Sequence, residues 1–371
     1  MIALPPSPKL PIVALASCFE QVTNSYKFYW FLAILDHVRE NQSPLMPFQS
    51  LLASMVGLSW YPLIFYRLSL GKQDQLGKVV NLISQVSGLD ANSSKAQIIA
   101  ATLRHLEARD GVGLQTAQLA TFVPYRFLSP FFAPQLRGLP DWEKNRRIRQ
   151  LAEEAFSSSE PSLYRFVRKP DLGIEIHPDW YDYLQQHLKI LSDFCFWNLV
   201  NYLQKNNPNV LNIAAKLFIP AQRELNLARQ FWNLVLSRKG EILCIYSGEP
   251  IHRGAYSIDH FLPWRFVAHD ALWNLAPTSR RVNSAKSDCV PDLAYLDRFA
   301  ELQHEAVQIV SQTSRSERLL EDYVLLFRIG DIHELQTMSL STFRERLREA
   351  IAPQIPIAAN MGFVTGWRFS P

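Results

Sequence analysis

The apolar residues of this chain follow helical spacing through its first 240 residues, and then the pattern changes. In residues 27–40 they recur every three or four positions, as on the buried side of a helix. Residues 241–251 instead read EILCIYSGEPI, an apolar run interrupted by Ser-Gly, which is typical of a strand and a hairpin. Helical spacing returns from residue 292. The chain is therefore predicted to be mainly α, with helical regions before and after a small β-containing segment.

Proline and turn residues divide the first helical region. Pro62 predicts that the apolar helix before it ends at Trp60 or Tyr61 and then kinks or restarts. Residues 122–140 hold four prolines and five aromatic residues, which predicts an ordered loop that acts as a boundary or a lid. Residues 180–205 predict one long helix, with another helix after Pro208.

Composition limits the classes of protein to which this chain can belong. With 371 residues, of which 48% are hydrophobic and 19% charged, the chain is globular rather than disordered and is long enough for two or three units. Its formal net charge of +4 tolerates a polyanionic partner without requiring one.

The cysteines and the N-terminal segment indicate the compartment. Cys18, Cys195, Cys244 and Cys289 form no CxxC pair, so neither a disulfide scaffold nor a complete structural zinc site is spelled out. Residues 1–21 lack an early basic residue and are broken by prolines, unlike a secretory signal. The longest apolar run near this segment, Phe28 to Leu35, is far shorter than the roughly 20 residues of a membrane span. We expect a cytoplasmic protein that does not enter a membrane.

Aromatic and basic clusters each allow two interpretations. The aromatics of residues 48–66 suit base stacking, but core packing is the commoner role for such residues. The basic residues between 144 and 149 have neighbouring glutamates, and those between 344 and 348 are interleaved with glutamates. They suit phosphate contacts or, more commonly, a solvated helix face.

One stretch carries a set of polar residues that together suit catalysis. Asp259 and His260 are adjacent, Asn274 follows His260 by 14 positions, and Asn283 follows it by 23. A hairpin and then a short helix, capped by Thr278 or Ser279, would bring Asp259 and His260 toward Asn283. A carboxylate and a carboxamide oxygen can hold a hard cation, and an imidazole beside them can take a proton from water. This combination predicts a nuclease.

The same residues resemble the HNH endonuclease family, whose fold is called ββα-metal. The resemblance covers residues 244–292 and is closest to the HNH domains of RNA-guided CRISPR effectors. It rests on the Asp259-His260 pair, Pro263, Asn274, and the N-x-x-K-S-D pattern that begins at Asn283. The flanking regions carry none of this resemblance. Together with their helical patterns, it predicts three regions: 1–235, helical and binding DNA or a partner; 236–295, the nuclease domain; and 296–371, a helical tail.

Roles follow from the resemblance, residue by residue. Asp259 and Asn283 would hold one divalent ion, Mg²⁺ or Mn²⁺, and His260 would deprotonate the attacking water, leaving 5′-phosphate and 3′-hydroxyl ends. Asn274 would hold the loop and orient the histidine backbone. As isolated features, the same Asp-His pair would more often be a turn residue and a satisfied polar side chain.

The residues around this set bear on two further questions, which side chains contact substrate phosphates and whether the domain binds a structural zinc. Lys286, Arg280 and Arg281 are candidates to contact substrate phosphates. Many relatives bind a structural zinc through two CxxC pairs, whereas here Ser247 stands three positions after Cys244 and Cys289 is alone. The sequence therefore predicts no structural zinc.

Two functions remain open at this stage. One is a DNA endonuclease of bacterial antiviral defence or restriction, which would need a homodimer, a partner nuclease or repeated nicking to cut both strands. The other is a nuclease subunit or adaptor of a larger protein or guide-RNA complex, silent until recruited. RNA as the substrate is a less favoured third possibility.

Overall fold

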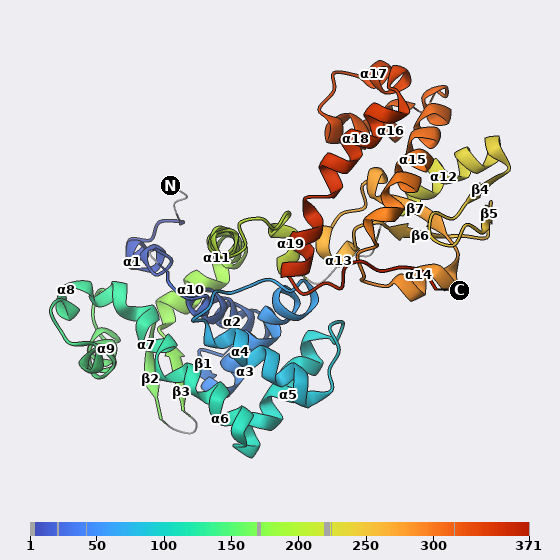
Figure 1. Ribbon diagram of the computed structural model, residues 1–371. Coiled ribbons are helices and arrows are strands. Elements are labelled where there is room, and N and C mark those ends of the chain that lie inside the picture. Colours follow the sequence, from blue (N-terminus) through green and yellow to red (C-terminus); the bar gives the residue numbers. More distant parts are fainter. Residues whose placement is uncertain are drawn as a thin grey trace. The chain divides into compact units, whose positions relative to one another are not determined.

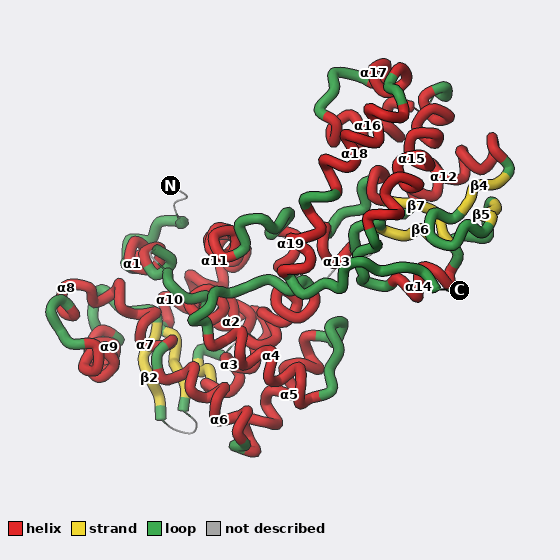
Figure 2. The backbone as a smooth tube through the Cα atoms, viewed as in Figure 1, coloured by secondary structure: helices red, strands yellow, loops and turns green. Residues whose placement is uncertain are grey.

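A computed structural model describes residues 4–20, 22–41, 43–168, 172–218, 223, 225–314 and 316–370. Residues 1–3 and 21 of the segment judged unlike a secretory signal lie outside these ranges. The chain forms two compact units, Met1–Phe218 (unit 1) and Ile219–Pro371 (unit 2) (Figure 1). Helices far outnumber the short strands (Figure 2), so the mainly α prediction is confirmed. The division of roles at residues 235 and 295 stays a prediction.

The core of unit 1 is built around α2 (Tyr26–Asn41), whose side chains are buried on most of its circumference. It packs against α3 (Phe48–Trp60) and α11 (Leu188–Asn206). The aromatic residues of this region fill the core; Trp30 and Trp60, for example, are fully buried. The core interpretation of the aromatic residues is thus confirmed.

The remaining helices of unit 1 surround this core. As predicted, α3 ends at Trp60, and a π-helical turn, Tyr61–Phe65, follows with Pro62 in its first turn. The others are α1 (Ile12–Ser17), α4 (Gln75–Ser87), α5 (Lys95–Ala108), α6 (Gly111–Gln118), α7 (Val123–Leu128), α8 (Ala133–Leu136), α9 (Asp141–Ala155) and α10 (Pro178–Gln186).

The loop predicted for residues 122–140 is wrong. This stretch forms α7, a 3-10 turn at Ser129–Phe132, and α8, all inside unit 1. Pro124, Pro130 and Pro134 each stand at the first or second position of one of these elements, where the missing backbone N–H is not needed. The prolines therefore begin short helices, and the stretch is neither a boundary between the units nor a loop.

Two further predictions for unit 1 are corrected. The long helix expected over residues 180–205 is interrupted at His187, between α10 and α11, and only a 3-10 turn, Ala214–Leu217, follows Pro208. An unpredicted antiparallel sheet joins β1 (Leu45–Pro47), β3 (Gly173–Ile176) and β2 (Tyr164–Val167) in that order. Its strands have three or four residues each, too few to show alternation in the sequence.

Unit 2 starts with α12 (Asn226–Lys239) and the predicted hairpin of β4 (Glu241–Leu243) and β5 (Pro250–His252). A second antiparallel pair follows, β6 (Ser257–His260) with β7 (Leu275–Thr278), and then α14 (Arg280–Lys286). Between β6 and β7 lie α13 (Trp264–Val267) and a 3-10 turn, Leu272–Asn274. The tail contains α15 (Leu296–Ser311), α16 (Ser316–Phe327), α17 (Ile332–Thr337), α18 (Leu340–Ile351) and α19 (Gln354–Asn360).

One hydrophobic core runs through unit 2. It includes Trp232 of α12, Leu275 of β7, Phe299 of α15 and Phe343 of α18. The chain after α19 returns to the residues that follow α14, where Trp367 bridges to Pro291. The segment with the predicted site is thus packed between helices, and the last residues of unit 2 support it.

Among the described residues, one helical stretch is long and apolar enough to cross a membrane. It spans Phe48–Phe65, and 72% of it is buried inside the structure. This is the helix that forms the core of unit 1 with α2.

Candidate functional site

The candidate site is built on two paired strands and one helix. In the β6–β7 pair, Asp259 lies opposite Ala276 and His260 opposite Leu275. Ser279, one of the two predicted capping residues, starts α14 by accepting a hydrogen bond from the Val282 amide. Because β7 leads into α14 after one residue, the helix returns over β6. The predicted hairpin-then-helix arrangement is confirmed.

Asp259 is buried and its two carboxylate oxygens have different partners. Oδ2 accepts a hydrogen bond from the Tyr246 hydroxyl at 2.8 Å, and Oδ1 lies 3.1 Å from the Lys286 ammonium. The side chains of Asp259 and Lys286 are 3% and 1% exposed. Lys286 Nζ also donates to the His260 backbone oxygen at 2.6 Å. A cation thus sits against β6, held by two oxygen atoms.

Tyr246 is the second support of the Asp259 carboxylate. Burial, and then the negative charge of Asp259 to which it donates, raise the pKa of the Tyr246 hydroxyl well above its usual range. The hydroxyl therefore remains a hydrogen-bond donor. Its ring packs edge-on against Tyr295 and Trp367, with centroids 5.1 and 5.4 Å away. Tyr295 and, from the tail of unit 2, Trp367 thereby fix the donor that orients Asp259.

His260 is held through one ring nitrogen. Its Nε2 lies 2.7 Å from Oδ1 of Asp270, a residue between α13 and the turn at Leu272. The His260 side chain is 4% exposed and that of Asp270 is 21% exposed. The imidazole is therefore nearly covered, and Asp270 occupies one of its two ring nitrogens.

Asn274 clamps the chain that follows β6. Its Oδ1 accepts the Leu262 amide at 2.8 Å and its Nδ2 donates to the Leu262 carbonyl at 2.9 Å. The Asn274 backbone oxygen also accepts the Phe261 amide. This geometry is what the predicted loop-holding role requires, although that role itself stays a prediction.

Replacing Asn274 with alanine is expected to destabilise unit 2 by about 2–4 kcal/mol, because two backbone groups of Leu262 lose their partner in a fully buried place. Hydrogen-exchange mass spectrometry of peptides from residues 244–292 measures this loss. Asn233→Ala is the control, since Asn233 is half-buried and accepts one bond from Tyr256. Equal protection in both variants would contradict the clamp.

The structure places the other predicted residues in different surroundings. Asn283 is half-buried on α14, one turn before Lys286, so both side chains project from the same side of the helix. Arg280 is exposed. Arg281 is 57% exposed, pairs with Glu249 and lies over the Phe369 ring. Lys286 is bonded to Asp259 rather than exposed to a substrate, so its phosphate role stays a prediction.

The oxygen atoms at β6 fit a hard cation. In the described part of the chain, no three His, Cys, Asp or Glu side chains gather as a metal cluster. The predicted ligands are one carboxylate, Asp259, and one carboxamide, Asn283, and such oxygen atoms suit Mg²⁺. Asp259 and the carbonyl of His260 already hold the ammonium of Lys286. A metal ion on Asp259 would have to share or take that position.

Two residues of the site were missed in the sequence. Asp270 lies ten positions after His260, and a second carboxylate close to an Asp-His pair was the available signal. Tyr246 precedes Asp259 by 13 positions and lies in the turn between β4 and β5, so nothing local indicated it. Cys244 contacts the Thr278 hydroxyl at 3.2 Å, and the absence of structural zinc stays a prediction.

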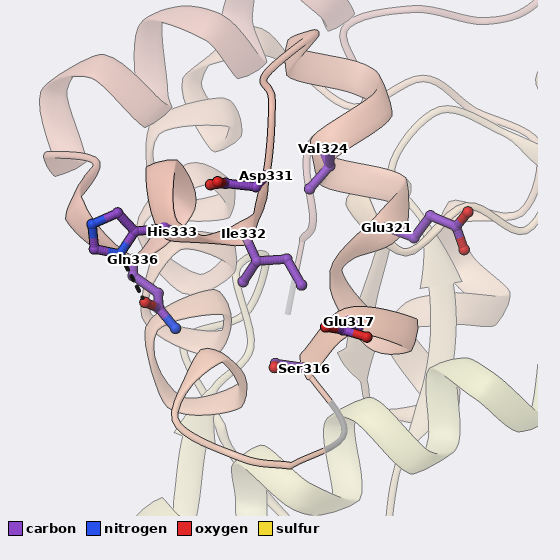
Figure 3. A pocket seen from close by; sticks show the side chains of 8 residues that line it. All are labelled: Ser316, Glu317, Glu321, Val324, Asp331, Ile332, His333 and Gln336. Atoms are coloured by element: carbon purple, nitrogen blue, oxygen red, sulfur yellow. Dashed lines mark hydrogen bonds between the residues drawn. The ribbon is translucent and has the colours of Figure 1, made fainter.

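A separate open pocket of about 540 Å³ lies between α16 and α17 (Figure 3). Three carboxylates line it, and Glu321 points away from Asp331 and His333. Asp331 caps α17 by accepting the Glu334 amide. Because carboxylates repel phosphate, this pocket is unsuited to a nucleic-acid backbone. Its lining is Ser316, Glu317, Glu321, Val324, Asp331, Ile332, His333 and Gln336.

Several basic side chains on these helix faces are paired with acidic ones. Arg146 lies near Glu143 in α9, and Arg344 and Arg348 of α18 pair with Glu301 and Asp297 of α15. The solvated-face interpretation of both helices fits these pairs. Neither face offers a stripe of unpaired positive charge to a phosphate backbone.

Comparison with known proteins supplies one match. Residues 244–292 match the family model described as HNH endonuclease. This range contains all the predicted site residues. Neither the curated proteins nor the solved structures give a match. HNH nucleases act on nucleic acids and generally depend on a divalent metal ion. Residues 244–292 of this chain therefore form a domain of the HNH endonuclease family.

Proposed function

We propose that this chain is a metal-dependent DNA endonuclease of the cytoplasm, acting in bacterial antiviral defence or restriction. The observation that carries the proposal is the placement of Asp259 and His260 at the end of β6, beneath the helix that carries Asn283. All three residues lie within the range that matches the HNH endonuclease family model. The support for DNA, rather than RNA, is the resemblance to nucleases that cut DNA.

Asp259 and Asn283 would hold the divalent ion, Mg²⁺ or Mn²⁺. When bound, it would stabilise the negative charge that develops on the phosphate and on the leaving oxygen. His260 acts as the general base through Nδ1, because its Nε2 is held by Asp270. Asn274 fixes the backbone that leaves β6 through its two bonds to Leu262.

The reaction is the hydrolysis of one phosphodiester bond. The water oxygen bonds to phosphorus, the bond from phosphorus to the 3′ oxygen breaks, and the water proton goes to Nδ1 of His260. The 3′ oxygen takes a proton from solvent, which leaves 5′-phosphate and 3′-hydroxyl ends. Arg280 and Arg281 are at or near the surface of α14, from which they would contact neighbouring phosphates. Lys286 would also contact a substrate phosphate if its ammonium moved away from Asp259.

A second candidate function is a nuclease that stays silent until a partner protein or guide-RNA complex recruits it. The covering of the site favours this candidate, since His260 and Asp259 are 4% and 3% exposed. The Asp259 carboxylate is also neutralised by Lys286. A substrate phosphate would reach the imidazole only after local opening, and binding of a partner to the exposed parts of the chain would supply such a change.

Supercoiled plasmid distinguishes the two candidates. We expect the purified chain with Mg²⁺ to convert it to the open-circular form, and EDTA to prevent this conversion. Ligation of the products without prior phosphorylation would identify 5′-phosphate and 3′-hydroxyl ends. Open-circular product alone indicates nicking by one site, whereas linear product indicates a homodimer or paired nicks. If the purified chain is inert and cuts plasmid only when a captured partner is added, the second candidate replaces the first. Cutting that continues in EDTA contradicts both candidates.

A further inference from the structure

His260 and Asp270 form a carboxylate–imidazole pair, and Asp270 was not among the site residues predicted from the sequence. His260 ends β6 and Asp270 lies in the connection from α13 to β7. Their atoms Nε2 and Oδ1 are 2.7 Å apart, and both side chains are mostly covered, at 4% and 21% exposure. Such a distance is that of a strong hydrogen bond to a charged acceptor.

The connection that carries Asp270 is fixed from several sides. The Asp322 carboxylate of α16 accepts the Leu272 amide at 2.8 Å. The His269 ring lies 5.3 Å from that of Trp273, and the His269 Nδ1 accepts the Ala271 amide. Asn274 clamps the same connection to Leu262. Asp270 is therefore presented to His260 by a supported backbone on both sides, not by an unsupported loop.

The chemistry of this pair decides which nitrogen of His260 is basic. An ionised carboxylate only accepts hydrogen bonds, so the nitrogen that faces it carries the proton. A neutral imidazole has one N–H, which leaves the lone pair on Nδ1. The same carboxylate stops the ring from rotating, and it stabilises the positive charge that appears once Nδ1 takes a proton.

The geometry points to Asp270 as the positioning residue of this nuclease site, which selects the Nε2–H form of His260 and aims Nδ1 at the attacking water. This inference rests on the proposed function for its kinetic consequence. Its structural consequence is the position of the proton on the imidazole, which can be measured whether or not the protein cleaves DNA.

Nitrogen-15 NMR of the histidine side chains tests the structural part. The chain has nine histidines, and the signals absent from His260→Ala identify His260. At a pH where the imidazole is neutral, we expect the wild-type ring to carry its proton on Nε2. In Asp270→Asn the side-chain amide can donate to Nε2, so we expect Nδ1–H to become populated. Asp270→Glu keeps an acceptor-only group and is expected to retain Nε2–H.

Plasmid cleavage tests the kinetic part. We expect Asp270→Asn to lower kcat about 100-fold with little change in KM, and Asp270→Glu to lose less. Asp297→Asn is the matched control, because Asp297 is an exposed carboxylate of α15 that pairs with Arg348. It should leave both the His260 signals and kcat unchanged.

The outcomes separate this inference from the proposed function. Nδ1–H in the wild type, or Asp270→Asn with wild-type signals and wild-type kcat, overturns the role of Asp270. If the proton position shifts as expected but no variant, including the wild type, cuts DNA under any condition, the proposed function fails and the positioning of His260 by Asp270 stands. If Asp270→Asn does not fold, the spectra of the wild type and of Asp270→Glu test the role of Asp270 instead. Absence of the Nε2–H form in either of them overturns that role.

Discussion

Replacing His260 with alanine is expected to lower the rate of DNA cleavage by about 1,000-fold, because a general base contributes on the order of 10²–10⁴ in rate. The fold should survive. The imidazole makes its side-chain bond to Asp270, which is 21% exposed and can be hydrated once the ring is gone. Single-turnover cleavage of plasmid with Mg²⁺ measures the rate, and circular dichroism checks the fold.

His252→Ala is the matched control for this experiment. His252 lies on β5 in the same unit, is exposed, and is outside the motif. Its replacement should leave the rate unchanged. Undiminished cutting by His260→Ala would show that the site is wrongly assigned, whereas equal loss in both variants would point to general damage to unit 2.

Replacing Lys286 with methionine is expected to destabilise unit 2 by about 3–5 kcal/mol, the usual cost of leaving one partner of a buried ion pair without its counter-ion. Asp259 would retain its Tyr246 bond but lose the Lys286 ammonium from its carboxylate. Hydrogen-exchange mass spectrometry of peptides from residues 244–292 measures the loss. Adding Asp259→Asn to Lys286→Met should restore much of it, because the buried charge is then removed.

A metal ion should also compensate for Lys286→Met if it binds at Asp259 as proposed. Mg²⁺ is expected to protect the variant more than it protects the wild type, in which the ammonium competes for the same carboxylate. Lys239→Met is the control, since Lys239 pairs with Glu305 at 32% and 48% exposure and such pairs contribute less than about 1 kcal/mol. A loss for Lys286→Met no larger than that of this control would refute the buried-pair account.

The parts of the site that were predictable depend on local signals. Pro263 ends the strand after His260, Ser279 caps α14, and Ser-Gly marks the β4–β5 hairpin. These positions fix the order of strand, strand and helix without knowledge of the rest of the chain. The family resemblance then added the roles of residues within that order.

The parts that were missed depend on contacts between distant residues. In unit 1, Leu45 pairs with Glu175 across more than 100 residues of chain, and strands so short show no alternation. Pro130 and Pro134 suggested a loop because proline occurs both in loops and at the start of helices. Lys286 has the sequence context of a surface lysine of a helix end, yet the fold of β6 beneath α14 buries it on Asp259.

The packing of Trp367 against Tyr246 has a consequence for protein synthesis. Tyr246 orients Asp259, but Trp367 is translated 121 residues after Tyr246. While the ribosome still holds the tail, the Asp259 carboxylate lacks part of its support even though every motif residue has been made. A nascent chain that stalls before Trp367 should therefore be a poor nuclease. Such a delay would protect the nucleic acids around the ribosome from a half-made enzyme.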